Sequence, residues 1–126
     1  MVTTEVAHFS KECNTWREAL RSQREEFTRM KNELQQAAAH ITSKDALMDV
    51  EHYENQFDIQ LTNIHDLKKS IKAHDSLSAF QTHTFNGPPP PEVADDHEKL
   101  AEEYKYLRGR LNELKSDFQQ FIINYT

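Results

Sequence analysis

Histidine is the residue type in this sequence with the widest chemical use, and the chain has seven histidines and a single cysteine. The segments Glu5–His8 and Asp49–His52 each place a carboxylate three residues before a histidine. This is the spacing of the metal ligands in di-iron helical bundles. If the chain reverses near residue 42, however, the two segments lie at opposite ends of a helical hairpin, so they cannot share a metal ion.

A second group of side chains converges at one end of the predicted fold. With reversals near residues 42 and 87, His8, His74 and His97 meet at this end, with Cys13 one layer deeper. Imidazoles and a thiolate on facing helices are the ligands of a tetrahedral zinc site. The plainer interpretation is that the end of a bundle is exposed to water, where histidine costs little. We favour the plainer interpretation and keep zinc binding as the alternative.

Signatures of catalysis are missing from the sequence. It contains no glycine-rich phosphate loop and none of the GxSxG, HExxH or CxxC motifs. A tightly packed helical bundle of this size also lacks the cleft that small-molecule chemistry needs. We therefore expect no enzyme and no cofactor, and interpret the chain as a protein–protein interaction or scaffold module. The alternative function is binding of zinc or another transition metal by the histidine cluster.

Charge and composition limit the partners. The net charge of −6 argues against binding to nucleic acid and to an anionic membrane. No window approaches the roughly 18 apolar residues of a membrane-spanning helix, and the first residues lack the basic start and apolar run of a signal peptide. A lone cysteine excludes an intramolecular disulfide and favours a reducing compartment. We therefore expect a cytoplasmic protein whose partner is another protein.

The segment Asn86–Pro91 contains all four prolines and one of the two glycines. Four consecutive prolines cannot lie inside a helix and favour a stiff, extended polyproline conformation. We predict a Pro-rich connector over residues 83–91. We interpret it as a spacer, because basic residues that would suit a proline-recognising domain do not flank it. Since the rest of the chain has almost no glycine or proline, it is expected to be all-α.

Apolar residues recur at alternating steps of three and four residues in three segments, which predicts helices with one apolar stripe each. We expect these helices at about residues 3–41, 44–82 and 92–125. The first stripe is Val2, Val6, Phe9, Cys13, Trp16, Leu20, Gln23, Phe27, Met30, Leu34, Ala37 and Ile41. The second is Val50, Tyr53, Phe57, Leu61, Ile64, Leu67 and Ile71, thinning to His74, Leu77 and Phe80. The third is Val93, His97, Leu100, Tyr104, Leu107, Leu111, Leu114, Phe118, Phe121 and Tyr125.

The first reversal is predicted without help from glycine or proline. Thr42 and Ser43 are good residues to cap the start of a helix, and the apolar stripe changes phase at this point. A straight helix cannot keep both stripes on one partner, so a reversal is the economical solution. The rival is one helix of about eighty residues, which needs a second chain to bury its stripe.

Three helices of matched length with short connections predict a single domain over residues 1–126. The expected architecture is an elongated, up-down-up antiparallel three-helix bundle with coiled-coil-like packing. Gln23, the polar residue in the first stripe, is expected to fix the register of the helices. Apolar residues outside the stripes leave room for a homodimer near the first reversal. They are Leu47, Met48, Tyr106, Ile122 and Ile123.

Overall fold

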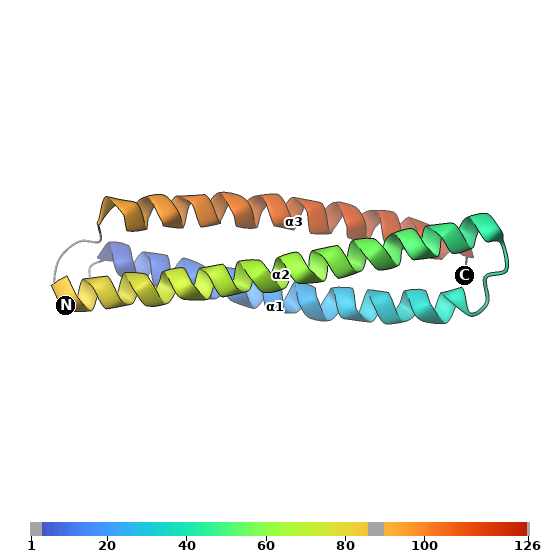
Figure 1. Cartoon of the computed structure of the whole chain (residues 1–126), viewed down its shortest axis with the longest axis horizontal. Helices are drawn as coiled ribbons and strands as arrows, with labels where there is room; N and C mark the ends of the chain where they lie inside the picture. Colours follow the sequence, from blue (N-terminus) through green and yellow to red (C-terminus); the bar gives the residue numbers. More distant parts are fainter. Residues whose placement is uncertain (1–3, 86–89, 126) are drawn as a thin grey trace.

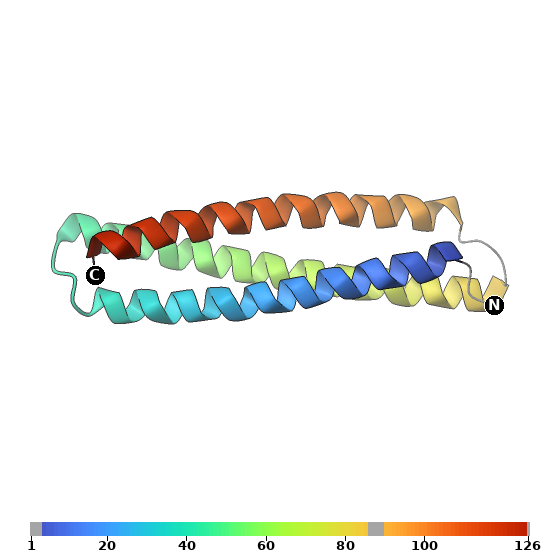
Figure 2. The same cartoon turned by 180° about the vertical axis from the view of Figure 1, so that it is seen from behind.

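A computed structural model describes residues 4–85 and 90–125, and it consists of three long helices with no strand in those residues. Helix α1 spans Thr4–Ala38, α2 spans Lys44–Phe85 and α3 spans Pro91–Tyr125. The chain runs up through α1, down through α2 and up again through α3, so that neighbouring helices in sequence are antiparallel (Figure 1 and Figure 2). The predicted all-α three-helix bundle is confirmed.

The first reversal lies near the predicted position, but α1 ends at Ala38 and not near residue 41. The N–H of His40 donates to the carbonyl of Ala37 at 3.0 Å, and the N–H of Ile41 donates to the carbonyl of Ala38 at 3.2 Å. These hydrogen bonds across three residues tighten the chain beyond the helix end and satisfy carbonyls that the helix leaves free.

Ser43 caps the start of α2. Its Oγ accepts a hydrogen bond from the N–H of Ala46 at 3.4 Å, and its carbonyl accepts one from the N–H of Leu47 at 2.9 Å. This is the bonding pattern of a helix N-cap. The cap defines where α2 begins, and it excludes a single unbroken helix through both segments.

The second connection is shorter than predicted. Helix α2 continues to Phe85, so residues 83–85 belong to the helix and not to the connector. The reason is that these residues include neither glycine nor proline. Pro91 is the first residue of α3, one position earlier than expected, and the N–H of Val93 donates to the carbonyl of Pro90 at 2.9 Å. The predicted polyproline conformation falls mostly on residues 86–89, which lie outside the described part of the chain.

The centre of the core is built from one phenylalanine of each helix. Phe27, Phe57 and Phe118 are fully buried or nearly so. The ring of Phe57 packs edge-on against both others, with centroid distances of 5.8 Å to Phe27 and 4.9 Å to Phe118. Such edge-to-face pairs add to the free energy gained from burying the rings, so this layer helps to set how the helices align.

The buried polar residue at the middle of the bundle is Gln60 and not Gln23. Gln23 is half-buried, whereas only 3% of Gln60 is exposed. The side-chain amide of Asn63 donates to Oε1 of Gln60 at 3.2 Å. If a polar layer fixes the register of the helices, α2 therefore supplies its buried member.

The end of the α2 stripe was predicted wrongly. Leu77 and Phe80 are 46% and 63% exposed, and Ser78 lies in the core in their place. The predicted positions from Ile71 to Phe80 follow one another at three successive steps of three residues, which rotate the stripe away from the partner helices. Alternating steps of three and four residues keep a stripe facing its partners. The core face of α2 therefore continues from Ile71 through His74 to Ser78.

Of the apolar residues predicted to lie outside the stripes, Ile122 is buried against the core, which corrects that expectation. The remaining four are exposed; they are Leu47, Met48, Tyr106 and Ile123. None of the helices in the described residues has a stretch long and apolar enough to cross a lipid bilayer.

Candidate metal centre

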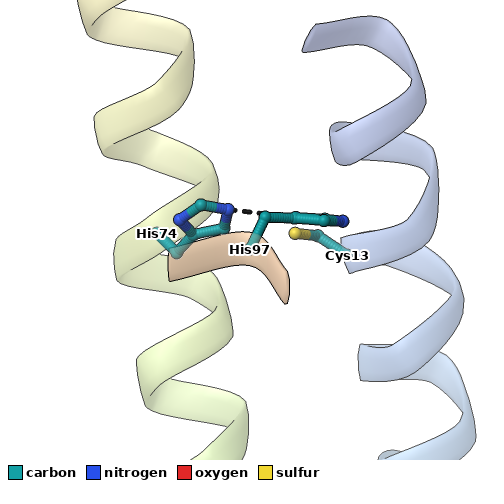
Figure 3. Close-up of side chains that lie close together, drawn as sticks. All are labelled: Cys13, His74 and His97. Carbon is teal, nitrogen blue, oxygen red and sulfur yellow. Dashed lines mark hydrogen bonds between the residues drawn. The ribbon is translucent and has the colours of Figure 1, made fainter. Parts of the chain in front are cut away.

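Cys13, His74 and His97 lie together in the interior of the bundle, and each comes from a different helix (Figure 3). One donor atom of each residue lies within 4.8 Å of the donor atoms of the other two. The three residues are 0%, 7% and 5% exposed, respectively. The structure therefore gathers one thiol and two imidazoles, the preferred ligands of zinc, away from bulk water.

Two aromatic rings of α1 hold the imidazole of His97. The Phe9 ring stacks on it with a centroid distance of 4.0 Å, and the Trp16 ring stacks on it at 4.9 Å. Phe9 and Trp16 lie one turn to either side of Cys13 on the same face of α1. The apolar stripe through which α1 packs on the other helices thus also fixes the plane of the His97 ring.

Hydrogen bonds link the two imidazoles to each other and to a carboxylate. His74 Nε2 lies 3.0 Å from His97 Nδ1, and His97 Nε2 lies 3.0 Å from Glu12 Oε1. A buried polar side chain without such partners would destabilise the fold. The histidines are therefore accommodated in the core through this network.

Burial raises the pKa of the Cys13 thiol from 9.0 to about 11, and the negative charge of Asp75 adds to the shift while Arg17 opposes it. Burial also lowers the pKa of His74, with the His97 ring contributing and Asp96 and Asp75 opposing. Near neutral pH the thiol thus keeps its proton, whereas His74 is neutral and has a lone pair to donate. Because a thiolate is the form that binds metals, coordination would release the proton of Cys13.

The distance between the two donor nitrogens is close to that expected around a tetrahedral metal ion. Zinc bonds of about 2.0–2.1 Å to nitrogen and about 2.3 Å to sulfur place the two nitrogens about 3.3 Å apart and the sulfur about 3.5 Å from each. His74 Nε2 and His97 Nδ1 are 3.0 Å apart. The Sγ of Cys13 lies within 4.8 Å of a donor nitrogen of each histidine.

His8, the fourth candidate ligand from the sequence, does not join this cluster. Its side chain is exposed, and its Nε2 lies 3.0 Å from Glu12 Oε1. Helix α2 begins beyond the end of α1 (Figure 1 and Figure 2), so residues of α1 lie level with later residues of α2 than a symmetric reversal predicts. Cys13, and not His8, is consequently the α1 residue that faces His74.

Glu12 is the member of the site that the sequence analysis missed. It lies beside the apolar stripe of α1, next to Cys13 and four residues after His8. A carboxylate and a histidine at this spacing share one side of a helix, which was the available signal. Its contact with His97 on α3 depends on how the helices pack.

Comparisons of the chain with protein-family models, with curated proteins and with solved structures found no match. The geometry of this site and the exposed surface of the bundle are therefore the features from which a function is inferred.

Proposed function

We propose that the protein binds a transition metal ion, with zinc the best fit, through Cys13, His74 and His97. The observation that supports this proposal is the meeting of one thiol and two imidazoles from three helices in the buried core. This donor set favours zinc or copper over magnesium and calcium, which prefer oxygen ligands. A free thiol also suits a reducing compartment, so we place this function in the cytoplasm.

A metal ion at this position would act on the fold, because each of the three helices supplies one ligand. The ion would link α3 to the hairpin of α1 and α2 near the end where α2 finishes (Figure 1). Metal ions that bind only the folded state stabilise it in proportion to their affinity. The ion is thus expected to stabilise the protein, and its fourth coordination position stays available to water or to another ligand.

The test is a zinc titration of the purified 126-residue protein, followed by thermal unfolding and calorimetry. Zinc at about 100 times its Kd should stabilise the folded state by about 2.7 kcal/mol. Cys13→Ser and His74→Gln should abolish the zinc-dependent rise in melting temperature. His65→Gln, which changes an exposed histidine of α2, is the matched control and should keep it. If zinc leaves the melting temperature of the unmodified protein unchanged, the proposal is wrong.

The opposite end of the bundle supports a second candidate function, docking of another protein. The first reversal and the end of α3 lie at this end (Figure 1), and four apolar residues of α2 and α3 close to them in sequence are exposed. They are Leu47, Met48, Ile123 and Tyr125. Exposed apolar side chains at one end of a bundle can form an interaction site if they are contiguous on the surface.

Sedimentation equilibrium tests whether the docking partner is a second copy of the chain. Self-association that Met48→Glu and Ile123→Glu abolish would support a homodimer through this end. If the protein stays monomeric and captures no partner through these residues, this second candidate is contradicted.

A further inference from the structure

Glu12 occupies a distinctive position beside the cluster of Cys13, His74 and His97. Its side chain is partly exposed, and its Oε1 lies 3.0 Å from Nε2 of the buried His97 and 3.0 Å from Nε2 of the exposed His8. The carboxylate thus contacts the ring nitrogen of His97 that points away from the His74 ring. Within the described residues, its hydrogen bond to the cluster is made through His97, while its negative charge also contributes, as a smaller cause, to the raised pKa of the Cys13 thiol.

The hydrogen-bonding chemistry of the two groups decides where the proton of His97 lies. An ionised carboxylate can only accept hydrogen bonds, and a neutral imidazole carries one N–H and one lone pair. The contact between Glu12 and His97 is therefore favourable only when the proton is on Nε2. If the proton were on Nδ1, the lone pairs of Nε2 and Oε1 would face each other at 3.0 Å.

We infer that Glu12 is a positioning residue that holds His97 in the tautomer with its proton on Nε2, leaving the lone pair of Nδ1 directed at the candidate metal position. This inference rests on the proposed metal-binding function, because it gives Glu12 the role of positioning a metal ligand. Carboxylates that accept the second N–H of a metal-bound histidine are a common feature of metal sites, where they fix both the tautomer and the ring orientation.

The surroundings of His97 agree with this assignment. The stacked rings of Phe9 and Trp16 leave the imidazole little freedom to turn over and exchange its two nitrogens. With a lone pair on Nδ1 of His97, the Nε2 of His74 supplies the hydrogen in the 3.0 Å contact between them. A metal ion would take the place of this hydrogen between the two nitrogens, with His74 carrying its own proton on Nδ1 instead.

The first arm of the test needs no metal. The ¹⁵N chemical shifts and two-bond couplings of the imidazoles report which ring nitrogen carries the proton. The metal-free protein should show His97 protonated on Nε2. Glu12→Lys places a group there that can only donate, and should move the His97 proton to Nδ1. Detection of the Nδ1–H tautomer in the unmodified protein would overturn the inference.

The second arm measures zinc affinity by calorimetry. Glu12→Lys should weaken zinc binding by about 10- to 100-fold. Glu12→Gln keeps an oxygen that can accept from Nε2 and should retain most of the affinity. Glu5→Lys makes the same change of charge at an exposed position of α1 and should bind zinc as the unmodified protein does. Equal affinities of the Glu12→Lys and Glu5→Lys variants would contradict the role of Glu12.

The two arms separate this inference from the proposed function. If the unmodified protein binds no zinc, metal binding is wrong, and the ring spectra alone decide whether Glu12 sets the tautomer of His97. If zinc binds but the tautomer is the opposite one, the metal proposal stands and the role of Glu12 is wrong. Before either experiment is interpreted, circular dichroism checks that each variant keeps its helical fold.

Discussion

His97 and Ser78 are both polar residues in the core of this bundle, and they differ in the hydrogen bonding of their side chains. Both nitrogens of His97 have hydrogen-bonding partners, which offset the loss of contact with water. Ser78 lies one turn beyond His74 on α2, and its Oγ is buried with no hydrogen-bond partner in the described structure. A buried hydroxyl without a partner destabilises the folded state.

We therefore predict that Ser78→Ala stabilises the protein. The substitution removes the unpaired hydroxyl with almost no change of shape and raises helix propensity, for an expected gain of about 1 kcal/mol. Urea unfolding measures the change. Ser70→Ala, at an exposed position of the same helix, is the control for propensity alone. If Ser78→Ala is less stable than Ser70→Ala, the hydroxyl has a partner that matters.

Because of Tyr53, the stability of the folded protein is expected to depend on pH in the alkaline range. Its pKa is raised above 10.0 by burial first and then by the charges of Asp117 and Asp49, and its hydroxyl donates to the backbone carbonyl of Asp117 at 3.3 Å. The unfolded chain loses this proton at a lower pH than the folded protein does. The contribution of Tyr53 to stability is thus complete below pH 10 and declines as the pH rises towards the pKa of the folded state.

The comparison of Tyr53→Phe with the unmodified protein isolates this effect, because the other titrating groups are the same in both. The free energy of unfolding, measured in urea at pH 9, 10 and 11, should fall more steeply for the unmodified protein. Parallel pH profiles of the two proteins would mean that Tyr53 ionises equally easily in both states.

At the level of single helices, Gly109 is a local weakness in α3. It lies on the exposed side of the helix, and a Cβ added there would meet no heavy atom within 4 Å. Gly109→Ala should therefore stabilise the protein by about 1 kcal/mol, since alanine loses less backbone entropy in a helix than glycine does. Thermal unfolding provides the measurement. A fall in melting temperature would show that a partner or a second copy approaches α3 at this position.

The helix ends show how far local sequence determines an element. Ser43 was predicted as a cap from its residue type, and its Oγ occupies that role in the structure. The end of α1 was misplaced by three residues, because no glycine or proline marks it and the last turn is tightened by backbone hydrogen bonds. Strong local signals thus set the start of α2, whereas the end of α1 depends on the packing of the turn.

For the whole molecule, stability depends on all three helices sharing one core. The residues of α3 that belong to this core form nearly its entire inner face. They are Leu100, Leu107, Leu111, Leu114, Phe118, Phe121 and Ile122. Without α3, the apolar stripes of α1 and α2 face water on one side, and isolated amphipathic helices gain most of their stability from such packing.

We predict that a chain ending at Phe85 loses its cooperative thermal unfolding or self-associates to cover the exposed stripe. Circular dichroism and sedimentation velocity distinguish these two results, both of which follow from the missing partner helix. A monomeric hairpin that melts at the temperature of the three-helix protein would show that α3 contributes little to the fold.

The sequence by itself determined that this chain forms three helices, because the spacing of apolar residues and the cluster of prolines are local properties that specify where helices run and which face of each is buried. It also indicated the histidines and the cysteine as possible ligands. Only the tertiary structure decided that Cys13 and not His8 faces His74, and that Glu12 reaches His97. The offset of one helix along another depends on the packing of side chains such as Phe27, Phe57 and Phe118 across the core. No spacing within a single helix contains that information.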